Sequence, residues 1–103
     1  MFSIFKKKII IPHVRLTGVI GSAGRFKQGI DLASQRDLLT KAFNFKKPKV
    51  VAISINSPGG SPVQSHLIYS YIRQLAKKND TKVLIFAEDV AASGGYFIAC
   101  AGD

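Results

Sequence analysis

The chain has 103 residues, enough for one small domain with a hydrophobic core. Its hydrophobic content of 47% and the lack of low-complexity segments exclude a disordered protein. A net charge of +9 would suit nucleic acid, anionic lipid or acidic partners, but the lysines are scattered apart from short clusters at 6–8 and 46–49. Because aromatic residues do not alternate with them, we interpret the charge as a solvated surface and predict no nucleic-acid partner. We also predict no cofactor and no metal ion.

Residues 1–13 are predicted to be a basic tail. Pro12 ends the short apolar run 9–11, so we expect no signal peptide, and no segment approaches the length of a transmembrane helix. The apolar residues Phe2, Ile4 and Phe5 beside three lysines could make a peripheral contact with an anionic membrane. The interpretation we prefer is a frayed tail that leads into the first strand.

The first half of the chain predicts a strand, a loop and a helix. Residues 14–20 alternate as a strand does, with Gly18 as a possible bulge, and 24–29 form a polar loop bounded by glycines. From Asp31, a plausible N-cap, apolar residues recur at helical spacing as far as Phe43, and Pro48 disfavours helix in the residue before it.

The second half predicts two further strand–helix units. The apolar runs 50–55 and 82–87 are typical of strands buried on both faces. The helix between them begins at Pro62 with Ser61 as its cap and carries an apolar stripe from Val63 to Ala76, and a last helix begins near Gly95. The order β-α-β-α-β-α predicts an α/β fold with a parallel sheet and right-handed β-α-β crossovers.

Two glycine-rich turns, "NSPGGS" and "VAASGG", follow the second and third strands. Since the carboxyl ends of parallel strands share one edge, both turns lie where ligands bind such sheets. Acyl transfer needs a nucleophilic oxygen beside amide donors for the oxyanion. Ser93 offers the hydroxyl, and the N–H groups of Gly94 and of Gly59 or Gly60 offer the donors, although plain turns or a phosphate site would use similar strings.

The two turns together closely resemble the serine peptidases of the SppA/SohB signal peptide peptidase family. The matching stretches are "INSPGGSPVQSHLIYSYIRQL", "VAASGGYFIACAGD" and, as the opening strand, "RLTGVIG". The resemblance implies that 14–103 form the N-terminal portion of a ClpP/crotonase-like domain, incomplete after the nucleophile motif. It implies Ser93 as the nucleophile, with Gly59, Gly60 and Gly94 around the oxyanion hole.

The resemblance further implies hydrophobic peptide substrates, a Ser/Lys dyad, a homo-oligomer at full length and a bacterial, membrane-associated or cytoplasmic protein. The family's lysine lies well downstream of the serine motif, and no residue of this sequence matches it. The chain is therefore expected to be a peptidase fragment, inactive by itself, or a truncated binding remnant. His66 with Asp89 is a weaker substitute for the base, and crotonase-like acyl-CoA chemistry is a further alternative.

The remaining polar residues are interpreted as structural. Cys100 is the single cysteine, which excludes an internal disulfide, and we expect it to be a buried small hydrophobe. Asn56 and Ser57 are expected to hold their turn through side-chain hydrogen bonds to the backbone. Glu88 and Asp89 are expected to be exposed loop acids, and His13 has no evident role.

Overall fold

The computed structural model describes residues 9–21 and 29–103, and it confirms the predicted order of strands and helices. The elements are β1 (His13–Thr17), α1 (Leu32–Asn44), β2 (Val50–Ser57), α2 (Pro62–Asn79), β3 (Lys82–Ala91) and α3 (Gly94–Ala99). The three strands form one parallel sheet in the order β1-β2-β3. The predicted loop 24–29, except Gly29, and the membrane contact of Phe2, Ile4 and Phe5 lie outside the described residues.

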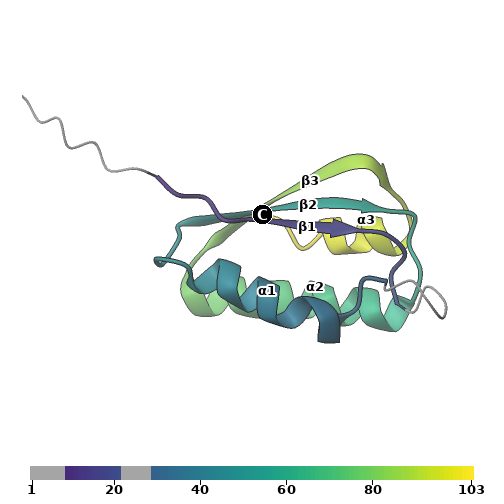
Figure 1. Ribbon diagram of the computed structural model, residues 1–103, viewed down its shortest axis with the longest axis horizontal. Helices are drawn as coiled ribbons and strands as arrows, with labels where there is room; N and C mark the ends of the chain where they lie inside the picture. The colour runs from purple at the N-terminus through teal and green to yellow at the C-terminus, as the bar shows by residue number, and fades with distance from the viewer. Residues whose placement is uncertain (1–8, 22–28) are drawn as a thin grey trace, which may run out of the picture.

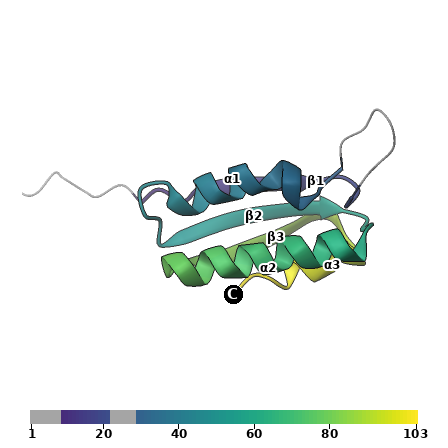
Figure 2. The ribbon, with the colours of Figure 1, turned by 90° about the horizontal axis from the view of Figure 1, so that it is seen from below.

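All three helices lie on the same face of the sheet. Figure 1 shows them below the strands, and Figure 2, seen from below, shows α1 and α2 side by side across the sheet. The strands follow one another in a single direction, and right-handed crossovers then always place the connecting helix on the same side. The core between the layers consists of Val14, Leu16, Ile20, Ile30, Leu39, Ala42, Phe43, Val51, Ile53, Ile55, Ile68, Ile72, Leu75, Ala76, Val83, Ile98 and Ala101.

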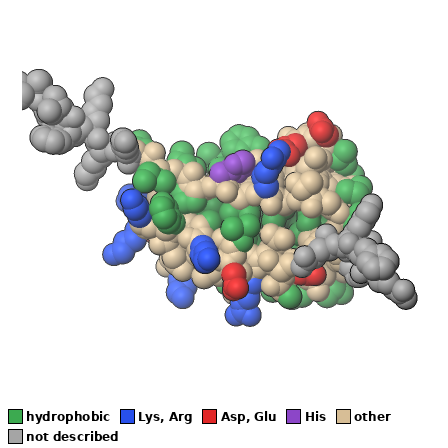
Figure 3. Space-filling view, viewed as in Figure 1, with side chains coloured by type: hydrophobic (Ala, Val, Ile, Leu, Met, Phe, Trp, Pro, Cys, Tyr) green, Lys and Arg blue, Asp and Glu red, His purple; other side chains and the backbone are tan. Residues whose placement is uncertain are grey.

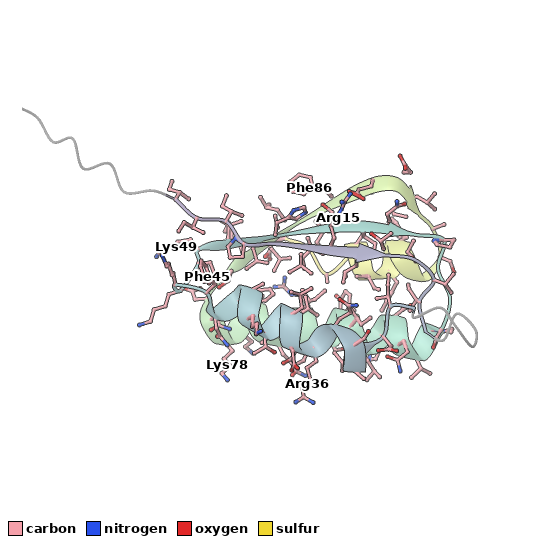
Figure 4. All side chains as sticks on the ribbon, in the orientation of Figure 1. Arg15, Arg36, Phe45, Lys49, Lys78 and Phe86 are labelled. Atoms are coloured by element: carbon pink, nitrogen blue, oxygen red, sulfur yellow. The ribbon has the colours of Figure 1, made fainter. Side chains whose placement is uncertain are left out.

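In the described part of the chain, the prediction of burial on both faces is wrong for 82–87 and holds in part for 50–55, where Ser54 is buried and Val50 and Ala52 are half-buried. Val51, Ile53 and Ile55 point toward the helices and are fully buried. On the opposite face of β3, Leu84 is 43% and Phe86 54% exposed, because no described helix covers that face (Figure 4). An apolar run does not by itself distinguish a strand covered twice from one covered once.

The uncovered face carries two side-chain contacts between strands, one from β1 to β2 and one that reaches from β1 across β2 to β3. His13, the first residue of β1 rather than the end of a tail, makes a 2.6 Å hydrogen bond between Nε2 and Ser54 Oγ. Arg15 of β1 donates to both carboxylate oxygens of Glu88, at 2.8 and 3.1 Å. β3 extends to Ala91 and is longer than predicted. Glu88 and Asp89 thus lie within this strand and not in a loop.

The predicted helix starts are confirmed. Asp31 Oδ1 accepts a hydrogen bond from the Ser34 N–H at 2.7 Å, and Ser61 Oγ accepts one from the Gln64 N–H at 3.2 Å. Two apolar residues of the predicted helices nevertheless face solvent, since Leu38 is 48% and Val63 is 67% exposed. Among the described residues, no helix has the length and apolar character needed to cross a bilayer.

Two phenylalanines near the end of α1 provide a matched test of the core. Phe43 is fully buried, whereas Phe45 is 48% exposed. We expect Phe43→Ala to lower the free energy of unfolding by about 3–5 kcal/mol, because it leaves a cavity under the sheet. Phe45→Ala should change it by about 0.5 kcal/mol or less. Urea denaturation followed by circular dichroism measures both, and equal losses would contradict this description of the core.

Asp103 provides a test of pH dependence. Its Oδ2 accepts a hydrogen bond from the Val83 N–H at 2.8 Å, and Oδ1 lies 3.3 Å from the Arg73 guanidinium. The Val83 N–H, followed by Arg73, lowers the pKa of the Asp103 carboxyl below its usual 3.8. A lowered pKa means that the stabilisation is fully present above the usual value and disappears as the pH falls through the folded-state pKa. Asp103→Asn should therefore be less stable than the parent at neutral pH, and the difference should vanish in acid. A difference independent of pH would contradict the assignment.

Candidate active site

The two glycine-rich turns meet at the carboxyl edge of the sheet, as predicted (Figure 1, right-hand end). Their contact is close: a Cβ built on Gly59 would lie 2.8 Å from Ser93 Cβ and 3.1 Å from the Gly94 nitrogen. Gly59 also has a φ of +107°, a value that side chains disfavour. Glycine is therefore required at position 59 both for the turn and for the approach of the serine loop.

A bulge in β3 sets the position of the second turn. Ile55 pairs with Ala87 and Ser57 pairs with Ala91, so β2 advances two positions while β3 advances four. Asn56 Oδ1 fills the gap by accepting a hydrogen bond from the Val90 N–H at 3.1 Å. The side chain of Asn56 thus replaces a ladder hydrogen bond that the bulge removes, and it bonds the neighbouring strand rather than its own turn as predicted.

Ser57 connects both turns. It is fully buried, its Oγ accepts a hydrogen bond from the Gly59 N–H at 3.1 Å, and its carbonyl oxygen accepts one from the Ala92 N–H at 3.2 Å. The first bond shapes the turn after β2, and the second holds the loop that carries Ser93. The expectation that Ser57 holds its own turn is confirmed, and its link to the second turn was not visible in the sequence.

Ser93 stands at the junction of β3 and α3 with φ 50° and ψ −117°. A non-glycine residue in this region costs of order 1–3 kcal/mol and is held there by its surroundings. The neighbouring bonds fix the loop: the Gly95 N–H donates to the Ala92 carbonyl at 2.8 Å, and the Phe97 N–H donates to the Ser93 carbonyl at 3.0 Å. Ser93 is exposed and its side chain makes no capping hydrogen bond. The hydroxyl is therefore accessible, not packed inside.

The hydrogen bonds made by the amide groups around Ser93 distinguish between the predicted oxyanion donors. The Gly59 N–H is already bonded to Ser57 Oγ. The N–H groups of Gly60 and Gly94 have no acceptor among residues 9–21 and 29–103. Of the two glycines left open by the sequence, Gly60 is thus the one with a free donor.

The segment after β1 clamps the Gly60 turn. β1 ends at Thr17, earlier than predicted, and Ile20 then forms an isolated bridge to Gly60. The Ile20 N–H donates to the Gly59 carbonyl at 2.9 Å, and the Ser61 N–H donates to the Ile20 carbonyl at 2.8 Å. A side chain on Gly60 would overlap the Ile20 backbone. No sequence pattern indicates this role of Ile20, apart from its being an apolar residue next to a glycine.

Ser93 lines a pocket of about 330 Å³. The lining residues are Gly60, Pro62, Ser65, His66, Ser93, Gly94 and Phe97. The His66 ring stacks on the Phe97 ring, with centroids 6.1 Å apart. No hydrogen bond joins His66 to Ser93 or Asp89 in the described part of the chain, so the alternative triad is not assembled here.

Cys100 contradicts its prediction. It is exposed, not buried, because α3 ends at Ala99 and the buried positions of this segment are Gly95, Ile98 and Ala101. The short helix turns Cys100 away from the core.

The structure is an α/β arrangement of one parallel sheet with two glycine-rich corners at its carboxyl edge. Residues 22–103 match the Clp protease family, and the chain belongs to that family. The expected α/β fold of ClpP type is confirmed.

Curated relatives agree with the resemblance to SppA-type peptidases. The chain is 32% identical over 96 residues to Protease 4 of Haemophilus influenzae and 46% identical over 59 residues to the chloroplastic serine protease SPPA of Arabidopsis thaliana. These matches cover 93% and 56% of this chain, but 15% and 8% of the relatives.

A higher identity, 57% over 94 residues, is found with a Brucella melitensis protein named Na(+)/H(+) antiporter NhaA. That match covers 90% of this chain and 13% of the Brucella protein. The chain thus spans a small part of each relative, and the activities of the whole relatives do not transfer to it directly.

Gly59 and Gly18 allow a matched test of the contact between the turns. Both have positive φ, but a Cβ on Gly18 would meet nothing within 4 Å, whereas one on Gly59 would meet Ser93. Both alanine variants should lose about 1 kcal/mol or more of stability through backbone strain. We expect Gly59→Ala alone to shift the backbone amide NMR signals of Gly94 and Gly95 strongly. Similar shifts in Gly18→Ala would contradict the contact.

Proposed function

We propose that this chain carries the nucleophile and the oxyanion donors of an SppA-type serine peptidase. The observation that supports this most directly is the juxtaposition, in one pocket, of the exposed Ser93 with the N–H groups of Gly60 and Gly94, which bond to no described residue. Membership of the Clp protease family and the relatives named as proteases give independent support. The antiporter name describes proteins of which this chain matches 13%, and no described residue argues for ion transport.

In this proposal Ser93 Oγ attacks the carbonyl carbon of the scissile peptide bond. The carbonyl oxygen becomes an oxyanion that accepts hydrogen bonds from the N–H groups of Gly60 and Gly94. A single donor of this kind contributes about 3–4 kcal/mol of transition-state stabilisation. The tetrahedral intermediate collapses to an acyl-enzyme as the amine leaves, and water then releases the acyl group.

The reaction also needs a base for the Ser93 proton. His66 is the titratable residue among those that line the pocket, and it is stacked on Phe97 rather than bonded to Ser93. We therefore assign the base to a neutral lysine amine from outside these 103 residues, as the family resemblance implies. That amine takes the proton from Ser93 and gives it to the leaving amine.

The substrates are proposed to be hydrophobic peptides bound in extended form. Pro62 and Phe97 give the pocket apolar walls suited to an apolar side chain. The main chain of the peptide would add as a strand beside the serine loop. A bacterial source is supported by the Brucella and Haemophilus relatives, and homo-oligomerisation by the exposed apolar face of β3.

The second candidate is a catalytically silent binding remnant of the same fold. The observation that favours it is the absence of a base next to Ser93 among the described residues. Chemical rescue of a missing base separates the two candidates.

Incubating the 103-residue protein with a fluorophosphonate should label Ser93 slowly. Added neutral alkylamine should accelerate labelling about tenfold or more, since a general base contributes roughly 10²–10⁴-fold when it is held in place. Mass spectrometry identifies the modified residue. Ser93→Ala should abolish labelling, whereas Ser70→Ala, on α2, should leave it unchanged.

Three outcomes would contradict parts of this proposal. Labelling that survives in Ser93→Ala would remove Ser93 as the nucleophile. Rapid stoichiometric labelling without amine would show that the base is not missing. No labelling even with amine would favour the silent remnant.

A further inference from the structure

The edge of the sheet opposite the candidate site combines exposed apolar side chains with lysines. Ile9, Ile10, Ile11 and Phe45 line a hollow of about 380 Å³. The other residues around it are Lys46, Lys47, Pro48, Lys49 and Val50, and we call this whole set the basic-apolar end. Figure 4 labels Phe45 and Lys49 at this end, and Figure 3 shows hydrophobic and basic side chains next to each other there.

The apolar side chains of this end are unusually exposed. Ile9 is 85% exposed, and Ile10, Ile11 and Phe45 are between 43% and 48% exposed. Single exposed apolar residues are normal on a soluble surface, but four around one hollow form a contiguous patch, which marks an interaction site. The patch is interleaved with cations, and Lys46 Nζ lies 5.5 Å from the centroid of the Phe45 ring.

The charge at this end is strongly one-sided. No residue that lines the hollow is acidic. The corner between α2 and β3 is bonded to the same loop, because the Lys82 N–H donates to the Lys49 carbonyl at 2.9 Å and Thr81 Oγ1 donates to the Pro48 carbonyl at 3.1 Å. That corner adds Lys77, Lys78 and Lys82, together with two carboxylates, Asp80 and Asp103, of which Asp103 is already paired with Arg73.

A purely structural role explains only some of these lysines. Lys77 and Lys78 lie in the last turn of α2, where cations favourably offset the helix dipole. Lys46, Lys47 and Lys49 follow α1 and belong to no helix, and Lys46 and Lys47 have positive φ values of 52° and 49°. Helix stabilisation therefore does not account for the lysines that surround the apolar hollow.

We propose that the basic-apolar end docks onto the surface of an anionic phospholipid bilayer. The isoleucines and Phe45 enter the boundary between headgroups and acyl chains, and the lysines contact lipid phosphates. A bilayer suits this end better than nucleic acid does, because a phosphate backbone offers no environment for four exposed apolar side chains. The inference does not depend on the proposed peptidase activity.

Docking of this kind fixes the orientation of the candidate site. β2 has eight residues, so the Ser93 pocket lies about 25 Å from the basic-apolar end, at the far end of the sheet. The pocket would therefore lie at about that distance from the lipid surface.

Vesicle co-sedimentation of the 103-residue protein tests the proposal. The probes are vesicles of phosphatidylcholine alone and of phosphatidylcholine mixed with phosphatidylglycerol. We expect binding to the anionic mixture and not to phosphatidylcholine alone, with a strong decrease as salt is added. The double variant Lys46→Gln/Lys47→Gln and the variant Phe45→Ser should each lower the partition coefficient about tenfold or more.

Matched control variants remove cationic or apolar side chains that lie outside the basic-apolar end. Arg15→Gln/Arg36→Gln removes two exposed cations that Figure 4 shows away from Phe45 and Lys49. Leu38→Ser removes an apolar side chain with the same 48% exposure as Phe45. Each control should lower binding by less than about threefold, since only general attraction is lost.

A fluorescence variant tests the contact directly. The sequence has no tryptophan, so Phe45→Trp introduces a single reporter. Its emission should shift to the blue with anionic vesicles, and that of Leu38→Trp should not.

The following results would overturn the proposal. The first is that the protein does not bind anionic vesicles at low salt. The second is that the control variants lose as much vesicle binding as Lys46→Gln/Lys47→Gln and Phe45→Ser do. A third is binding that deletion of residues 1–8 abolishes while Phe45→Ser and the lysine variant leave it intact. Retention of duplex DNA without vesicle binding would assign this end to nucleic acid. A concentration-dependent dimer that Phe45→Ser abolishes, without vesicle binding, would assign it to contact between copies.

Discussion

The buried residue Ser57 holds together the two corners on which the candidate site is built. Its hydroxyl accepts from Gly59 in its own turn, and its carbonyl accepts from Ala92 in the neighbouring loop. Both bonds are shielded from water, so breaking either would leave a buried polar group unsatisfied at a cost of about 1–3 kcal/mol. One residue therefore couples the two turns, through its side chain and its backbone carbonyl, and the amides of Gly60 and Gly94 owe their mutual position to it.

Irregular backbone surrounds this anchor, and it is concentrated at the same edge of the sheet. The bulge in β3 is bridged by Asn56, and Ser93 has a positive φ although it is not glycine. Bulges and strained residues that re-aim a side chain persist only where the surroundings hold them. Regular core packing under β2, with Ile53 and Ile55 fully buried, supplies that support.

The parallel arrangement separates two kinds of chemistry at the two edges of the sheet. The carboxyl edge gathers small residues, free amides and the Ser93 hydroxyl. The amino edge gathers the loop from Phe45 to Lys49, which is apolar and cationic. Because every crossover is right-handed and returns over the same face, the outer face of the sheet keeps Leu84 and Phe86 exposed and available for a further contact.

The sequence by itself determined the order of the elements, the caps Asp31 and Ser61, and the meeting of the two glycine-rich turns at one edge. These follow from local periodicity, from short-range hydrogen bonds and from the fixed direction of parallel strands. Tertiary structure alone decided which glycine of the first turn keeps its N–H free, because that depends on Ser57 Oγ and on the clamp by Ile20. It also decided that Cys100 is exposed and that no described helix covers one face of the sheet, since burial depends on which elements pack against a segment and not on the hydrophobicity of the segment.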